Sequence, residues 1–138
     1  MILFDRRAEA LEVIIAASGE ALEAIVHAIE EDAAANAPVD TGSLSDGYYI
    51  VTQHEDGYQD AAAAAMSLNP HVHILEHIDS YPDRLHAWVS NCTEHAVFVE
   101  LGTVHMAAQP SLGPAVEAHT EDFADSVSTS IVAALRRF

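Results

Sequence analysis

The stretch DRRAEALEVIIAASGEALEAIVHAIEEDAAANAPVDTGSL, residues 5–44, decides the fold of this chain. Its apolar residues recur in steps of three and four, which predicts a long amphipathic helix. Asp5 is the expected N-cap, and Pro38 ends the helix because the residue before a proline avoids the α region. The expected apolar stripe consists of Ala8, Leu11, Ile15, Leu22, Ile25 and Ile29, with Glu9, Glu12, Glu20, Glu23, Glu30 and Glu31 mostly off it.

The middle of the chain predicts a sheet. β-Branched and aromatic residues or alternating apolar residues favour strands at 48–52, 72–76 and 85–90. Asp56-Gly57 is the strongest hairpin signal, within a turn over 54–57. Residues 58–66 fit either a strand or an alanine-rich helix, and a break is expected at 80–83.

The last third returns to a helical pattern. Residues 95–101 fit a strand or a short helix that Gly102 ends, and Pro110 and Pro114 bracket the entry to a final helix. Its apolar stripe is Val116, Phe123, Val127, Ile131 and Leu135. We therefore predict a single domain over residues 1–138, of the α+β class. Its long N-terminal helix and C-terminal helix are expected to pack on one face of a mostly antiparallel β-sheet.

The charge balance is strongly acidic. The 138 residues include 22 Asp and Glu against five arginines and no lysine, for a net charge of −17. Such a surface repels a phosphate backbone, so direct nucleic-acid binding is not expected. Adaptation to a salty cytoplasm and a GC-rich genome are alternative explanations. We favour the halophilic one, because base composition explains missing lysine but not the surplus of acids.

Membrane and secretory roles are not expected from the sequence. The longest apolar run, residues 61–66, is far shorter than a membrane span. The N-terminus places its apolar residues before the positive ones, which is the reverse of a signal peptide. We therefore expect the protein to be made in a cytoplasm.

Histidine and cysteine raise the question of a metal site. The chain has nine histidines, and His71, His73 and His77 are weak candidate ligands because the first two would share one strand face. No HExxH pattern accompanies them, so we expect polar surface roles and no cofactor. The single cysteine, Cys92, is expected to be structural.

Two acidic motifs have both a catalytic and a structural interpretation. Glu100 lies in an apolar stretch, where burial would suit a general base, but it can also accept hydrogen bonds from a nearby turn. Asp40-Thr41-Gly42 matches the active-site triplet of aspartic proteases, yet it directly follows a helix stop. No nucleophile, second acid or phosphate loop is evident beside either motif, so we favour the structural interpretation and do not expect an enzyme.

Three motifs in order give the chain a resemblance to a known family. Residues 38–44 fit a P-x-D-T-G-x-L turn after a long helix, residues 95–103 fit Y-A-x-Y-V-E-x-G-T, and residues 109–115 fit Q-P-F-L-x-P-A. His95, Phe98 and Ser111 replace the usual Tyr, Tyr and Phe. The chain thereby resembles the tail-completion, or head–tail joining, proteins of tailed-virus necks, although its middle over about 54–85 is longer.

This resemblance implies a non-enzymatic virion protein that forms a ring, often a hexamer, and joins the head or neck to the tail tube. Its partners would be other neck and tail proteins, such as a head-completion protein, a tail terminator or the tail tube. DNA would pass through the lumen without specific binding, and assembly would occur in the host cytoplasm. A tail terminator, and a histidine-rich metal-binding protein, are the alternatives. The predicted structural or interface residues are Asp40, Thr41, Gly42, Glu100, Gly102, Thr103, Pro110 and Pro114.

Overall fold

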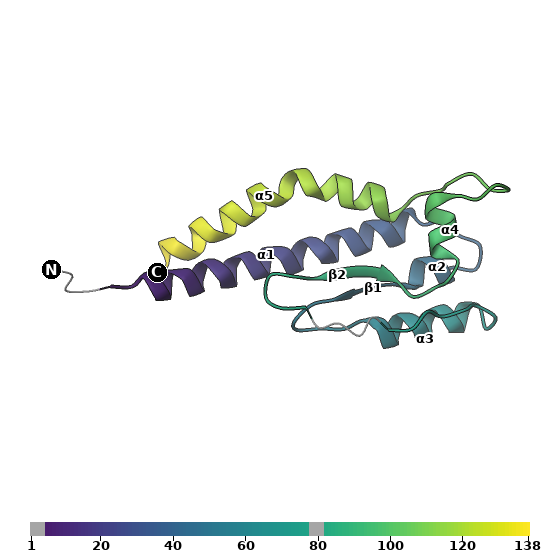
Figure 1. Cartoon of the computed structure of the whole chain (residues 1–138), viewed down its shortest axis with the longest axis horizontal. Helices are drawn as coiled ribbons and strands as arrows, with labels where there is room; N and C mark the ends of the chain where they lie inside the picture. Colours follow the sequence, from purple (N-terminus) through teal and green to yellow (C-terminus); the bar gives the residue numbers. More distant parts are fainter. Residues whose placement is uncertain (1–4, 78–81) are drawn as a thin grey trace.

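The computed structural model describes residues 5–77 and 82–138. Two long helices dominate it: α1 (Arg7–Asn36) and α5 (Leu112–Arg136) lie side by side and antiparallel, so that the described ends of the chain meet at one tip (Figure 1). There the Arg6 guanidinium lies 3.7 Å from the centre of the Phe138 ring, a cation–π contact. The predicted terminal helices are confirmed.

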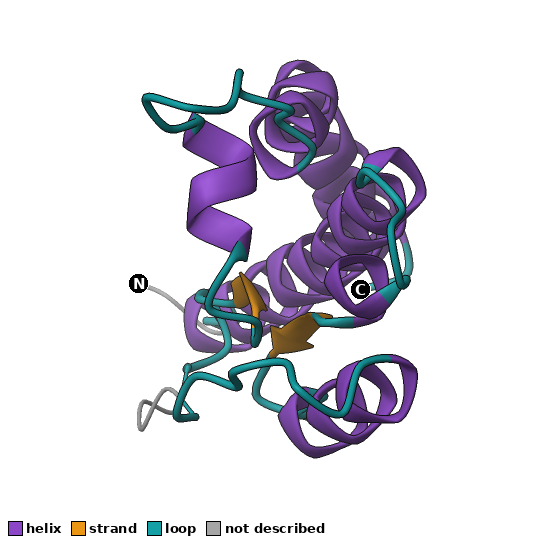
Figure 2. Ribbon diagram, turned by 90° about the vertical axis from the view of Figure 1, so that its right-hand side faces the viewer, coloured by secondary structure: helices purple, strands orange, loops and turns teal. Residues whose placement is uncertain are grey.

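The sheet is small and lies beside the C-terminal half of α1. Strands β1 (Tyr48–Val51) and β2 (Trp88–Asn91) pair antiparallel, with Tyr48 opposite Asn91 and Val51 opposite Trp88. Viewed from the α4 end, the strands occupy the middle, with the α1–α5 pair above them and α3 (Tyr58–Leu68) below (Figure 2). The α+β class with an antiparallel sheet is therefore confirmed, and the fold is mostly helical.

Alternation along β1 divides the core into two clusters. Successive side chains of a strand point to opposite faces. Tyr48 accordingly packs in a cluster with α1 and the start of α5, while Tyr49 and Val51 pack against α3. All four residues of β1 are buried. Besides Tyr48, the first cluster contains Ala33, Ala37, Leu44 and Ala115, and the second also contains Ala61, Ala65 and Cys92.

The Asp-Gly signal leads into a helix instead of a hairpin strand. The chain does reverse here: Thr52 N–H donates to the Glu55 carbonyl at 2.8 Å, and Val51 pairs with Asp56 in an isolated bridge. The Asp56 carboxylate then accepts the Tyr58 N–H at 3.1 Å. This N–H belongs to the first turn of α3 and has no hydrogen-bond partner within the helix. Of the two alternatives for residues 58–66, the structure takes the helix.

The predicted strand over 72–76 is reduced to one bridge, between Ile74 and Thr93. The reason lies in the preceding turn. There the Val72 N–H donates to the Asn69 carbonyl, so it cannot form a hydrogen bond between strands. Strand β2 begins at Trp88 and not at Leu85, because His86 N–H is held in a turn by Asp83. Of the expected break over 80–83, residues 80 and 81 lie outside the described residues.

The expected apolar stripe of α1 is only partly correct. Its fully buried residues are mostly small, and they belong to the face that packs on the rest of the fold: Ala17, Gly19, Ala21, Val26 and Ala33. Leu11, which the stripe includes, is 55% exposed. It lies in the N-terminal half of α1, which packs beside α5 and away from the sheet (Figure 1). None of the helices in residues 5–77 and 82–138 has the length and hydropathy needed to cross a bilayer.

Short helices connect these layers. Helix α2 (Ser43–Asp46) follows Gly42, whose φ of 88° is a left-handed conformation suited to glycine. Helix α4 (Ala96–Leu101) resolves the open choice between strand and helix for 95–101, and it ends at Gly102 with φ 78° and ψ 172°. Pro114 is the third residue of α5, so the prediction that it belongs to the first turn is confirmed. Helix α5 approaches the sheet only near its start, where Ala115 joins the Tyr48 cluster.

Candidate functional site

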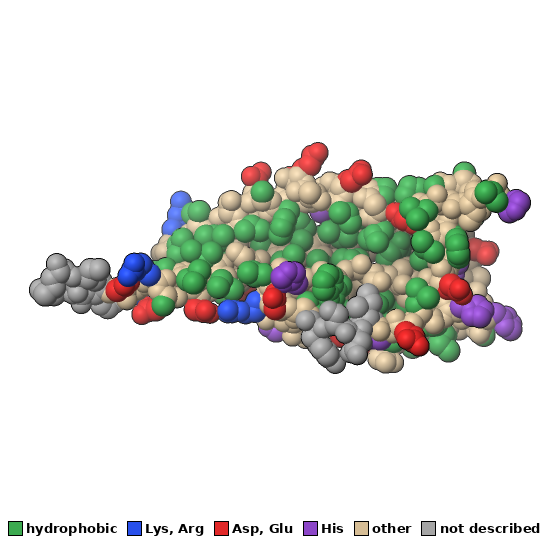
Figure 3. Space-filling model, viewed as in Figure 1, with side chains coloured by type: hydrophobic (Ala, Val, Ile, Leu, Met, Phe, Trp, Pro, Cys, Tyr) green, Lys and Arg blue, Asp and Glu red, His purple; other side chains and the backbone are tan. Residues whose placement is uncertain are grey.

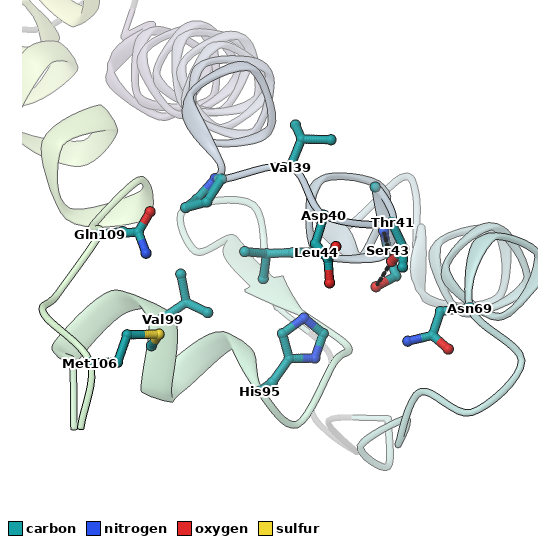
Figure 4. A pocket seen from close by; sticks show the side chains of 12 residues that line it. Val39, Asp40, Thr41, Ser43, Leu44, Asn69, His95, Val99, Met106 and Gln109 are labelled. Carbon is teal, nitrogen blue, oxygen red and sulfur yellow. Dashed lines mark hydrogen bonds between the residues drawn. The ribbon is translucent and has the colours of Figure 1, made fainter. Parts of the chain in front are cut away.

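The three motif segments meet around one cleft. It has a volume of about 530 Å³ and is lined by residues 38–44 together with Asn69, His95, Val99, Met106 and Gln109. In Figure 4 the side chains of Leu44, His95, Val99 and Met106 converge on its centre, from α2, the residue before α4, α4 itself and the loop that follows it. Segments that are far apart in the sequence thus form one continuous surface, which we call the motif cleft.

The first wall of the motif cleft is the Asp40-Thr41-Gly42 turn. The Thr41 hydroxyl donates to Ser43 Oγ at 3.0 Å and accepts the Ser43 N–H at 3.3 Å. Asp46 N–H donates to the Gly42 carbonyl at 3.0 Å, which starts α2. The Asp40 carboxylate is exposed and has no hydrogen bond or ion pair with the part of the chain that the structure describes. Thr41 therefore organises the turn, whereas Asp40 contributes charge to the rim.

Glu100 connects α4 to the start of α5. Its Oε2 accepts N–H groups from Ser111 at 2.9 Å and Leu112 at 3.2 Å, and its Oε1 accepts the Gly113 N–H at 2.7 Å. These are orphan donors of the first turn of α5, so the carboxylate satisfies them and also complements the helix dipole. Burial by itself would raise the pKa of Glu100, but the three donated hydrogen bonds outweigh it and hold the pKa below its ordinary value. A carboxylate in this state is an anchor and a poor general base.

The loop between α4 and α5 folds back on α4. Gly102 N–H donates to Phe98 O at 2.8 Å, Thr103 N–H to Met106 O at 2.8 Å, and Gln109 N–H to Val99 O at 2.8 Å. A Cβ on Gly102 would lie 2.7 Å from the Ala108 nitrogen, so only glycine fits there.

The tip of this loop and both prolines face solvent. Val104 is 94% exposed at the tip, and Pro110 and Pro114 are exposed near the start of α5. The Thr103 hydroxyl accepts the His105 N–H at 3.2 Å, which fixes the turn that carries Val104. The loop therefore has an ordered backbone and an apolar tip.

The three candidate metal ligands contact different partners. His77 Nε2 lies 2.5 Å from the Asp56 carboxylate, and His73 Nδ1 lies 3.9 Å from Glu94. His71 is exposed and donates its backbone N–H to the Asn69 side chain. Within residues 5–77 and 82–138, no group of three or more His, Cys, Asp or Glu side chains is arranged to hold a metal ion.

Histidine–carboxylate pairs recur instead, and several of them join elements distant in sequence. His54 Nδ1 lies 2.6 Å from Glu23, and His27 Nε2 lies 2.5 Å from Glu55, so two reciprocal pairs fix the 52–56 turn to α1. A further pair, His119 with Asp32, joins α5 to α1 at 2.5 Å. These contacts give histidine a structural use that sequence reasoning did not identify, because the pairing depends on tertiary neighbours.

Another contact missed at the sequence level involves Ser111. Its hydroxyl lies 2.7 Å from the Tyr48 hydroxyl in a buried hydrogen bond. This position therefore makes a polar contact between β1 and the cap of α5. Cys92 is buried on the other side of the sheet, and burial raises the pKa of its thiol, which fits the structural role expected for it.

Comparison of the chain with protein-family models, with curated proteins and with solved structures finds no match.

Proposed function

We propose that the protein is a structural subunit of a tailed-virus neck, of the tail-completion or head–tail connector type. It would assemble into a ring, such as a hexamer, that joins the head or neck to the tail tube, and it would catalyse no reaction. The observation that carries this proposal is the meeting of all three family-like motifs around the motif cleft. Glu100 links the second motif to the third by hydrogen bonds, which supports reading the motifs as one structural joint.

Exposed apolar side chains support a role in assembly. Hydrophobic side chains cover much of the face formed by α1 and α5 (Figure 3). Leu11 on α1 and Val132 on α5 are 55% and 47% exposed, and Val104 protrudes from the loop after Gly102. A contiguous exposed apolar patch is a common mark of a protein–protein interface. A closed ring requires two different contact faces on each subunit, and the helix pair and the loop are two such faces.

The charge distribution is suited to a ring through which DNA passes without being bound. In the face shown in Figure 3, the arginine side chains lie in the half of the molecule where α1 begins. Three of the five are paired: Arg6 with Glu9, Arg7 with Asp5, and Arg84 with Glu12. An acidic ring lumen repels a passing duplex, because binding a phosphate backbone requires free cations. Such a ring would reside in the virion and be assembled in the host cytoplasm, with the acidity suited to high salt.

The test is the oligomeric state of the purified chain. Multi-angle light scattering and native mass spectrometry, from about 0.15 M to about 3 M salt, should show a closed oligomer whose population rises as repulsion is screened. Val104→Asp should weaken the oligomer or its complex with neck partners, whereas Gln59→Glu adds the same charge on the exposed side of α3 and should not. A protein that stays monomeric at every salt concentration, also with neck partners present, would contradict the proposal.

A further inference from the structure

A second cleft, of about 320 Å³, lies between β2 and α4. We call it the β2–α4 groove and define it by Leu75, Val89, Asn91, Val97 and Leu101 along its walls. Its lining is mostly apolar, and Leu101 is 73% exposed. Binding clefts usually measure about 300–1,000 Å³ and are apolar with a few polar groups, so this groove has the size and character of a docking site.

The strand beside the groove has an open edge. The Ile50 carbonyl oxygen accepts the Gly57 N–H, on the side of β1 away from β2. Because backbone groups of an antiparallel pair alternate in direction, Val89, which stands opposite Ile50, points its N–H and C=O away from β1. These two groups have no hydrogen-bond partner in the described part of the chain. An unpaired edge of this kind is a template for another strand.

The two features indicate the same kind of ligand. Val89 and Asn91 stand opposite Ile50 and Tyr48, so their side chains share the face on which Tyr48 packs and on which the groove opens. A strand added beside Val89 would direct alternate side chains into the groove while its backbone bonds the edge. The expected ligand is therefore an extended segment with apolar residues at alternating positions.

We infer that the occupant is the N-terminal segment Ile2-Leu3-Phe4 of a second copy of this chain. This segment, which we call the N-terminal arm, lies outside the described residues and consists of apolar residues, of which Ile2 and Phe4 are types with high strand propensity. Added as a strand, it places Ile2 and Phe4 on one side, as the groove requires. The inference rests on the proposed function and deepens it, because it adds a specific contact between neighbouring copies to the two faces described above.

Distance excludes docking of the arm within its own chain. The arm precedes Arg7, the first residue of α1, whereas the groove lies near Tyr48 and Leu112, which pack around Ala33. A helical rise of about 1.5 Å per residue places Arg7 about 39 Å from Ala33. Residues 1–6 span about 21 Å even when fully extended. The arm can therefore fill this groove only in another copy.

The contact would join two different surfaces, the arm of one copy and the groove of the next. Because donor and acceptor surfaces differ, the contact is heterologous, and repeated around a closing rotation it produces a ring.

The first test changes the arm in the full chain. Ile2→Asp with Phe4→Asp should raise the dissociation constant of the oligomer at least about tenfold in sedimentation velocity at high salt. Gln59→Glu with Ser67→Asp adds two charges on α3 and should leave it unchanged. An arm variant that assembles like the wild type overturns the arm contact while the ring proposal stands.

The second test captures the contact covalently. Phe4→Cys with Leu101→Cys should give a ladder of disulfide-linked oligomers on mild oxidation, because the two positions meet between copies. Phe4→Cys with Met66→Cys should give none, since Met66 is exposed on α3, away from the groove. Equal crosslinking of both pairs overturns the inference.

The third test separates this inference from the proposed function. A synthetic peptide of residues 1–7 is titrated into the Ile2→Asp/Phe4→Asp chain, with Trp88 on β2 as the fluorescent reporter. We expect saturable binding that Val97→Asp abolishes. A wild-type chain that never oligomerises contradicts the ring, yet peptide binding would still support the groove. Absence of peptide binding overturns the inference. It is also overturned if Val97→Asp abolishes binding of a neck partner but leaves self-assembly unchanged.

Discussion

Replacing Glu100 with glutamine tests the link between α4 and α5. Glutamine keeps one acceptor oxygen, which can replace Oε2 toward the Ser111 and Leu112 N–H groups, but it presents an NH₂ group to the Gly113 N–H. Two hydrogen bonds change from charged to neutral acceptors, and the third is lost. Since a hydrogen bond to a charged group contributes about 1.5–3 kcal/mol and a neutral one about 1, we expect the free energy of unfolding to fall by at least about 2.5 kcal/mol.

The assay is urea denaturation at pH 7 in high salt, followed by Trp88 fluorescence. The matched control is Glu121→Gln, which removes the same charge from an exposed position on α5 that has no hydrogen bond with the described residues. It should change the stability by less than about 0.5 kcal/mol. Equal stabilities of the two variants would refute the assignment of Glu100 as an anchor.

The pH dependence gives the anchor a second signature. Because the folded-state pKa of Glu100 is lowered, its stabilising contribution is present above the ordinary value of 4.5 and is lost as the pH falls through the folded-state pKa. Protonated Glu100 has one good acceptor oxygen, as glutamine does. The stability difference between wild type and Glu100→Gln should therefore shrink below about pH 4.5. A difference that stays constant down to pH 3 would show that the loss has another origin.

Three further predictions concern Gly102, the Tyr48–Ser111 pair and Cys92. Gly102→Ala should cost about 1–3 kcal/mol, because φ 78° with ψ 172° is almost restricted to glycine, whereas Gly57→Ala at a negative φ should cost much less in the same urea series. Tyr48→Phe should cost about 1–2 kcal/mol by leaving the buried Ser111 hydroxyl unpaired, and adding Ser111→Ala should recover part of the loss; additive effects would contradict the pairing. Cys92, buried and with a raised thiol pKa, should react with iodoacetamide at pH 8 at least about tenfold faster in urea than in the folded protein, and equal rates would contradict its burial.

Local rules predicted the elements that depend on local sequence. The two long helices, their proline and glycine boundaries, and β1 follow from periodicity and turn chemistry at Pro38, Gly42 and Gly102. The strand over 72–76 was wrong because a turn bond takes the Val72 N–H. The choice for residues 58–66 stayed open because an alanine run has no periodicity to distinguish a buried strand from a helix.

The candidate site was predicted as separate motifs and not as one place. The sequence favoured a structural role for Glu100, but it could not identify the amides of residues 111–113 as its partners, because these become neighbours only when α5 returns along α1. The same holds for the pair of Tyr48 with Ser111, and for the histidine–carboxylate contacts.

The sequence by itself determined the helical frame, the net negative charge, and the three short motifs over residues 38–44, 95–103 and 109–115. Only the tertiary structure decided that these motifs surround one cleft, and that an open strand edge lies beside an apolar groove. The physical reason is the sequence distance over which each interaction acts. Helix and turn propensities act over a few residues, whereas a cleft or a strand edge depends on which distant segments pack together, and burial, rather than local preference, selects those partners.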